Sequence, residues 1–148
     1  MAIKLQSDLV VGTRTVPQAF TAGAVVAYLV DITIPTGVTL GTSDIVELGV
    51  LPAFHRVVDA MVVAASGFTD EKADIGIMTG AVGDDGDATR TSGNELFDDV
   101  GLTALARMTK SAAIVLASTD KDRSIGMKFT ASLTGAGQTV TLQFLLAQ

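Results

Sequence analysis

The chain has no cysteine and no tryptophan, and it has one histidine, one tyrosine and three prolines among its 148 residues. Without cysteine there are no disulfides, no thiolate metal sites and no cysteine nucleophile. One histidine, His55, is too few for a multi-histidine metal centre, and no G-x-S-x-G elbow accompanies it for a Ser-His-Asp site. We therefore expect a protein that is not an enzyme and binds no cofactor, with His55 half-exposed at the start of a strand.

Positive charge is also scarce. Lys and Arg number 10 against 16 Asp and Glu, which gives a net charge of −6, and the sequence pI is about 4.5. No basic stripe offsets the repulsion of phosphates, and six scattered Phe provide no stacking platform for bases. We expect no nucleic-acid partner. In the mixed-charge run around Arg123, we expect this residue to pair with Asp120 or Asp122 and fix a turn.

Long hydrophobic runs are missing as well. The most apolar stretch, Ala24 to Ile34, contains Asp31 and is about half the ~20 residues that a membrane helix needs. The N-terminus has no basic segment followed by an apolar core, so we expect no membrane partner and an unprocessed chain made in the cytoplasm. Yet the mean hydropathy is high, at +0.47. The apolar surface must be covered inside the fold or by neighbouring subunits.

What the sequence does contain is alternation with a period of two, which is typical of strands with one buried face. In the segment Val26 to Ile34 the even positions are apolar, and Asp31 and Thr33 face outward. In the segment Val46 to Leu51 we expect Glu47 and Gly49 to face outward. We expect strands at about 3–11, 26–34, 46–51, 55–65, 73–79, 112–117, 124–133 and 139–147, with 102–108 ambiguous between a strand and a helical turn.

Residues Gly80 to Gly101 form a run rich in Gly and Asp, which predicts a long acidic loop. We expect one short helical turn near its end, over 94–100, capped by Asn94. The carboxylates between Asp84 and Asp99 are hard oxygen ligands, but their spacing differs from an EF-hand. A solvated loop is therefore the expectation, and whether this loop binds Ca²⁺ stays open.

About eight short strands separated by Gly and Pro turns predict an all-β protein, with a jelly-roll-like β-sandwich of antiparallel strands as the natural fold. We expect one domain over residues 1–148, because no linker divides the chain. Residues 1–23 are expected to form a partly extended N-terminal strand and arm.

Four segments carry a resemblance to a known family. They are SDIVELGVLPAFHRVVDAMVVAA (43–65), ADIGIMTG (73–80), TDKDRSIGMKFTAS (119–132) and GQTVTLQFLLAQ (137–148), with the Leu51-Pro52-Ala53 corner and the run Asp122 to Gly126 as the strongest cues. Together they resemble the capsid decoration, or cement, proteins of tailed phages, over roughly two-thirds of the chain. Members of that family often have Gly where this chain has Phe54.

The resemblance implies a virion structural protein on the outer capsid surface, made in the host cytoplasm. It implies a homo-oligomer, a dimer or a trimer, that bridges subunits of the major capsid protein. Two other functions compete: a head-tail connector or tail component, and a carbohydrate-binding β-sandwich adhesin, against which the lack of Trp counts.

Within the decoration hypothesis we place capsid or subunit contacts on two segments. Arg14, Pro17 and Phe20 lie among small residues in a segment suited to an arm that orders on binding, with a plain surface loop as the alternative. The second segment is apolar on both faces and is either an interface strand or ordinary core. Its candidate contact residues are Ile114, Val115 and Leu116.

Overall fold

The computed structural model describes residues 3–7, 10–12, 24–110 and 116–148. Over these ranges the chain forms strands, turns and loops, and it contains no helix able to span a membrane. The strands are β1 (Ile3–Gln6), β2 (Val25–Thr33), β3 (Thr39–Leu40), β4 (Ile45–Leu51), β5 (Arg56–Ser66), β6 (Lys72–Ile77), β7 (Phe97–Gly101), β8 (Ala106–Arg107), β9 (Arg123–Phe129), β10 (Leu133–Thr134) and β11 (Thr139–Ala147).

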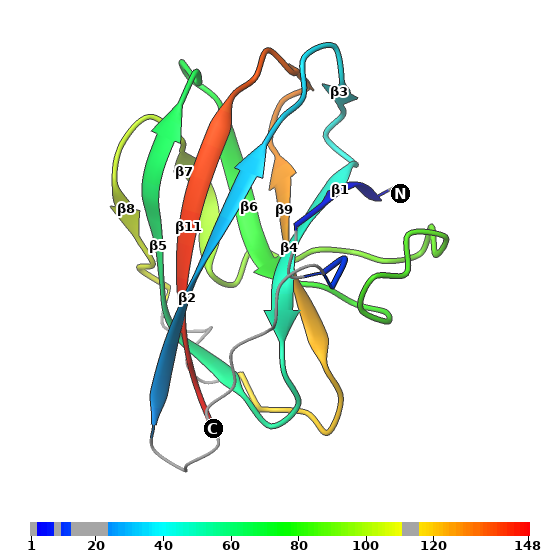
Figure 1. The fold of residues 1–148 in the computed structure, drawn as a ribbon, viewed down its shortest axis with the longest axis vertical. Helices are drawn as coiled ribbons and strands as arrows, with labels where there is room; N and C mark the ends of the chain where they lie inside the picture. The colour runs from blue at the N-terminus through cyan, green and yellow to red at the C-terminus, as the bar shows by residue number, and fades with distance from the viewer. Residues whose placement is uncertain (1–2, 8–9, 13–23, 111–115) are drawn as a thin grey trace.

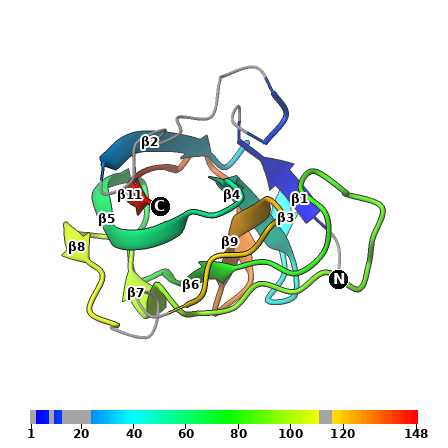
Figure 2. The same ribbon diagram turned by 90° about the horizontal axis from the view of Figure 1, so that it is seen from below.

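Two sheets face each other, as Figures 1 and 2 show from the side and from below. One has the order β1-β4-β9-β6-β7 and the other the order β2-β11-β5-β8, while β10 and β3 form a small ribbon at one end. Following the chain, β4 lies in the first sheet, β5 in the second, β6 and β7 in the first, β8 in the second, β9 in the first and β11 in the second. This repeated crossing between sheets is the connectivity of a jelly roll and confirms the expected fold.

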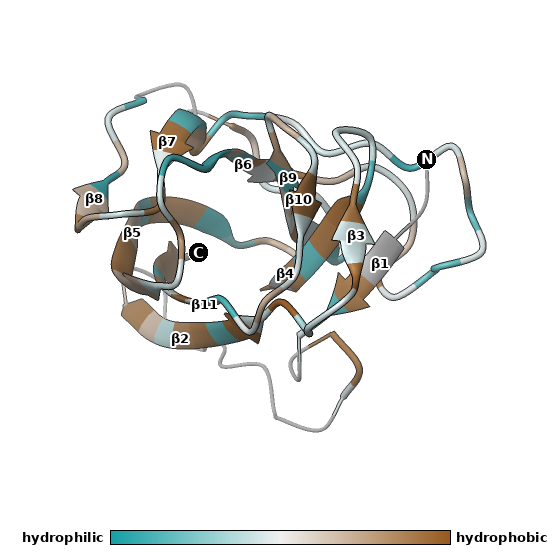
Figure 3. Cartoon of the chain, turned by 90° about the horizontal axis from the view of Figure 1, so that it is seen from above, coloured by the Kyte–Doolittle hydropathy of each residue, from teal (hydrophilic) through white to brown (hydrophobic). Residues whose placement is uncertain are grey.

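The predicted alternation determines which side chains meet between the sheets. β11 lies at the centre of its sheet and pairs antiparallel with β2 and with β5 along its whole length. Apolar side chains from every second position of β2, β9 and β11 fill the space between the layers, and the rings of Tyr28 and Phe144 lie 5.5 Å apart. Each fully buried side chain of this size contributes about 1.5–3 kcal/mol. Figure 3 shows hydrophobic residues concentrated on the strands, with the long loop mostly pale or hydrophilic.

Several strand boundaries differ from the expectation. The first strand ends at Gln6 rather than at residue 11, and it pairs parallel with β4, so the sandwich is not purely antiparallel. The strand expected over 124–133 ends at Phe129, and the ribbon of β3 and β10 was not expected. Of the ambiguous segment 102–108, Ala106 and Arg107 form strand β8.

The expected helical turn at 94–100 is wrong, because the chain there forms an edge strand. Leu96 donates its amide hydrogen to the carbonyl of Ile75 at 3.0 Å, and β7 then pairs with β6. Phe97 is buried in the core, whereas Asn94 donates from its side chain to Asp98 at 2.8 Å instead of capping a helix. Pairing with the open edge of β6 and burial of Leu96 and Phe97 outweigh the weak local preference for a helical turn.

Candidate functional site

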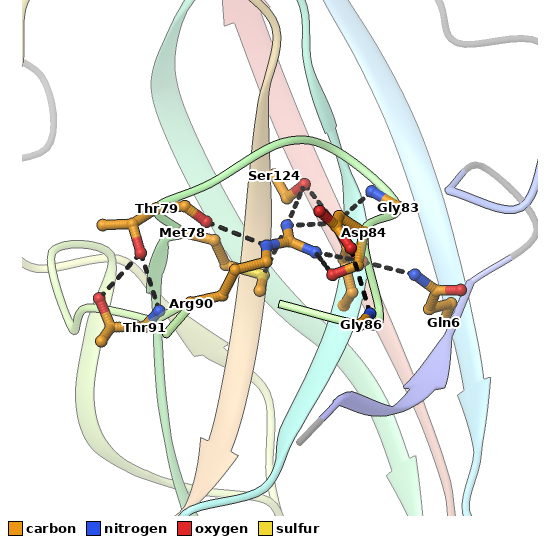
Figure 4. A network of polar contacts seen from close by, with 10 residues as sticks. Gln6, Met78, Thr79, Gly83, Asp84, Gly86, Arg90, Thr91 and Ser124 are labelled. Carbon is orange, nitrogen blue, oxygen red and sulfur yellow. Dashed lines mark hydrogen bonds and ion pairs between the residues drawn. The ribbon is translucent and has the colours of Figure 1, made fainter. Parts of the chain in front are cut away.

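The most extensive polar contact in the fold surrounds Arg90, in the long loop between β6 and β7 (Figure 4). Its guanidinium forms a bidentate ion pair with Glu47 of β4, with N–O distances of 2.7 and 3.2 Å, and neither side chain is exposed to solvent. Arg90 also donates to the carbonyls of Thr79 and Asp84, both at 3.0 Å, and to Ser124 at 3.2 Å. We call these five residues the Arg90 cluster.

Glu47 also binds the two strands that flank β4, namely β1 and β9, and the long loop. Its carboxylate accepts hydrogen bonds from the side chain of Gln6 at 2.7 Å, from the amide of Gly83 at 3.1 Å, and from the hydroxyl of Ser124. Burial by itself raises the pKa of this carboxyl, but the hydrogen bonds from Arg90, Ser124, Gln6 and Gly83 together hold the pKa below its ordinary value. Glu47 is therefore ionised at neutral pH and ties β1 and the long loop to β4.

This arrangement corrects one expectation. Glu47 was expected to face solvent as an outward position of an alternating strand, and it is fully buried, as is its partner Ser124. The reason is that the long loop folds over this part of the sheet and supplies Arg90 as a partner. A lone acid in an otherwise apolar strand is a signal that a partner is needed, but the sequence does not indicate which of the ten cations supplies it.

The long loop returns across β6 at close range. A Cβ on Gly76 would overlap the backbone of Gly93, and the amide of Gly93 donates to the carbonyl of Ile77 at 3.1 Å. Thus the loop is anchored at Arg90 in its middle and along β6 at its end. Figure 1 shows it projecting from the sandwich on the side of β1.

Many carboxylates of this loop have partners close by. Asp84 accepts from the amide of Gly86 at 3.1 Å, and Asp87 accepts from the amide of Thr89 at 2.8 Å. In β7, which follows the loop, Asp99 pairs with Lys72 at 2.8 Å. In the part of the chain that the structure describes, no group of three or more His, Asp or Glu side chains is placed to hold a metal ion.

A second feature is the corner between β4 and β5. Phe54 has a φ of 62° and its side chain is 60% exposed, an unusual combination for a bulky residue. Its amide donates to the carbonyl of Thr119 at 2.7 Å, and the amide of Ala53 donates to Asp122 at 2.8 Å. His55 is 2% exposed rather than half-exposed, and its Nδ1 donates to the carbonyl of Ala53 at 2.8 Å.

The corner lies at one end of the sandwich, where β4 and β6 end and β5 and β9 begin; Figure 2 looks onto this end. Here the sheets leave a depression of about 200 Å³, including space open to solvent, which we call the open end. Two of the residues around it are cations, Arg56 and Arg123, and the Nε of each is buried with no hydrogen-bond partner among the described residues. The lining residues are Leu51, Arg56, Val57, Ile77, Leu96, Leu116 and Arg123.

The expected pairing of Arg123 with Asp120 or Asp122 is not found. Asp122 accepts from the Ala53 amide instead, and none of the ion pairs between described residues involves Arg123. Burial lowers the pKa of the Arg123 guanidinium. The turn is fixed by backbone contacts of the corner, so the arginine remains directed toward the open end.

A third feature is the solvent side of the four-stranded sheet, which we call the outer face. Towards the end of β2 that begins at Val25 its side chains are mainly apolar, and Val25, Leu29 and Val63 are 55%, 44% and 39% exposed. Towards the other end, Asp31, Thr33 and their neighbours on β11 are polar. The apolar residues of this half, which we call the apolar half, are Val25, Ala27, Leu29, Met61, Val63 and Leu145, and Gln143 and the ion-paired Asp59 lie among them.

Most of the contact residues expected from the sequence lie outside the described ranges. This holds for Arg14, Pro17, Phe20, Ile114 and Val115. Leu116 is described, and it lies partly buried in a bend at the open end rather than in a strand. Sequence reasoning missed the open end itself, because its residues come from β4, β5, β6, β9 and two loops.

Three solved structures resemble this chain. A chain from the capsid of Ralstonia phage GP4 is 37% identical, with 97% of this chain and 96% of that chain covered and a TM-score of 0.82. A chain of the cyanophage Pam1 capsid asymmetric unit (14% identity, 90% and 91% covered, TM-score 0.59) shares the fold. So does one from the acid-stable capsid of Helicobacter pylori bacteriophage KHP30 (11%, 86% and 90%, 0.52). No protein-family model and no curated protein matches the chain.

Proposed function

We propose, from the premise that this chain belongs to the phage capsid protein family of the Ralstonia phage GP4 chain, that it decorates the outer capsid surface and bridges neighbouring major capsid protein subunits. As a member of that family it is a structural component of a phage virion. The observation that carries the finer proposal is the apolar half of the outer face. A sandwich whose core is already filled has no internal use for exposed Val25, Leu29 and Val63.

A bridging protein needs more than one contact surface. The outer face is one, and the open end with the exposed Phe54 is another. We assign the apolar half of the outer face to a second copy of this chain, since it needs cover while the protein is free in solution. The open end is assigned to the major capsid protein. The protein would then attach as a dimer or trimer.

The energetics suit this role. An interface of ~1,600 Å², of which about 60% is apolar, has at ~25 cal/mol per Å² of apolar surface a gross energy of about 24 kcal/mol, which exceeds the roughly 4–15 kcal/mol lost on association. Because many copies bind one shell and each bridges subunits, modest single contacts add up to strong retention. Decoration therefore requires no reaction pocket and no cofactor.

The test uses capsids that lack this protein. We expect the purified chain to sediment with them and to raise the temperature at which they rupture. Light scattering should give the mass of a dimer or trimer, and Val25→Asp should shift this mass toward that of a monomer. Thr33→Asp, which puts the same charge on the polar half of the same strand, is the matched control and should leave the mass unchanged. A wild-type protein that is monomeric and does not sediment with capsids would refute the proposal.

A further inference from the structure

We infer that the open end is a recognition site for a carboxylate, and that its occupant is an acidic side chain, flanked by an apolar residue, on the capsid subunit that this chain covers. The inference rests on the proposed function and adds the chemistry of one contact. Two independent observations carry it: the unpaired arginines and the strained, exposed Phe54 at the same end.

The first observation is an unbalanced charge. Arg56 and Arg123 approach one depression from different sheets, and no ion pair between described residues neutralises either of them. In a chain with a net charge of −6, two cations without acidic partners are conspicuous. Buried N–H donors without acceptors are rare in folded proteins, and they are a form of strain that a ligand can relieve.

The walls of the open end indicate the shape of the occupant. Apart from the two arginines they are apolar. A partner group therefore binds with its charge on the guanidinium groups and its apolar flank on Ile77 and Leu116, which are partly exposed. Arginine's planar fork matches a carboxylate through two parallel hydrogen bonds, which a single ammonium does not offer.

The second observation is Phe54. A bulky residue at φ 62° is held in a conformation that L-residues avoid, and here its ring is mostly in solvent. Strain of this kind persists where the surroundings impose it, and it is concentrated at binding sites. Phe54 thus offers an aromatic contact beside the carboxylate site. Aromatic residues and arginine are the residues most enriched among those that dominate binding energy at protein interfaces.

A protein carboxylate fits better than a nucleic acid. The overall negative charge repels a polyanion, whereas a single acid meets only the local field of the two arginines. The occupant is therefore an acidic residue of the shell protein.

The experiment compares capsid binding of wild-type protein with that of Arg56→Gln, Arg123→Gln and the double variant. Lys121→Gln is the matched control, because it removes the same charge from an exposed residue of the neighbouring loop. We expect each arginine substitution to weaken capsid affinity about tenfold, the double variant more, and the control less than about threefold. Because neither Nε has a hydrogen-bond partner in the described part of the chain, the melting temperatures should stay the same or rise.

The outcomes separate this inference from the proposed function. If wild-type protein binds capsids and the double variant binds equally well, the carboxylate site is refuted while decoration stands. If wild-type protein does not bind capsids, decoration fails, and the site is tested alone by titrating the capped dipeptide acetyl-Leu-Glu-amide against acetyl-Leu-Gln-amide. Selective shifts of the Arg56 and Arg123 Nε–H signals in NMR with the Glu peptide support the site; equal responses to both peptides overturn it.

Discussion

Replacing Arg90 by methionine removes the charge at the centre of the Arg90 cluster while keeping most of its volume. The variant loses both hydrogen bonds to Glu47, those to the carbonyls of Thr79 and Asp84, and the one to Ser124, and it leaves a buried carboxylate without its counter-ion. Removing one partner of a buried ion pair destabilises a protein by about 3–5 kcal/mol. A chain of this length has a total stability of roughly 7–22 kcal/mol.

For a domain of this size each kcal/mol shifts the melting temperature by about 2–4 °C, so we expect Arg90→Met to lower it by about 6–20 °C in a thermal unfolding scan. Arg107→Met is the control, because the Arg107 side chain is 70% exposed and its ion pair with Asp59 lies at the surface. Surface pairs contribute about 0–1 kcal/mol, so the control should shift by no more than about 4 °C.

The same substitution should release the segments that the cluster holds. Hydrogen exchange at the amide of Gly83, which donates to Glu47, should rise in Arg90→Met before the core strands are affected. Equal melting shifts for Arg90→Met and Arg107→Met, with unchanged exchange at Gly83, would refute the reasoning that this ion pair anchors the loop.

Three further predictions concern single residues. Burial raises the pKa of Glu47, but its hydrogen bonds hold the folded-state pKa below the unfolded value of about 4.3. The contribution of the ionised Glu47 to stability is therefore complete above that pH and is lost as the pH falls through the folded-state pKa. The difference in melting temperature between wild type and Glu47→Gln should accordingly narrow from pH 6 to pH 3. A constant difference contradicts this. Phe54→Gly relieves ~1–2 kcal/mol of left-handed strain against ~0.5–1 kcal/mol of added chain entropy, so stability should hold or rise slightly while capsid affinity falls about tenfold. A drop of more than ~4 °C would instead make Phe54 structural. Gly76→Ala places a methyl group against the Gly93 backbone, and we expect a loss of ~1–3 kcal/mol in chemical denaturation; an unchanged midpoint would mean that the loop does not need this close approach.

The sandwich could be predicted because its strands carry a local pattern. Period-two alternation located β2 and β11 to within one residue at each end, and the even positions that it marked as apolar in β2, such as Tyr28 and Val30, are buried. The crossing of strands between sheets followed from their number and spacing rather than from any single residue.

The contact between Glu47 and Arg90 could not be predicted, because it joins residues 43 positions apart and depends on how the long loop folds back. The same holds for the open end, whose residues meet only once both sheets are in place. For β7, the run of Asp and Gly suggested a loop, and pairing with β6 overrode that local preference. Local patterns thus predict strands and faces, while polar partners across the fold require the tertiary structure.

The most direct test is a cryo-EM reconstruction of the phage particle that contains this chain. Decoration predicts density for the sandwich on the outside of the shell, spanning neighbouring capsid subunits, with the apolar half of the outer face and the open end both covered by protein. Density confined to the tail or to a connector ring, or a surface position that leaves Val25, Leu29 and Phe54 in solvent, would contradict the account.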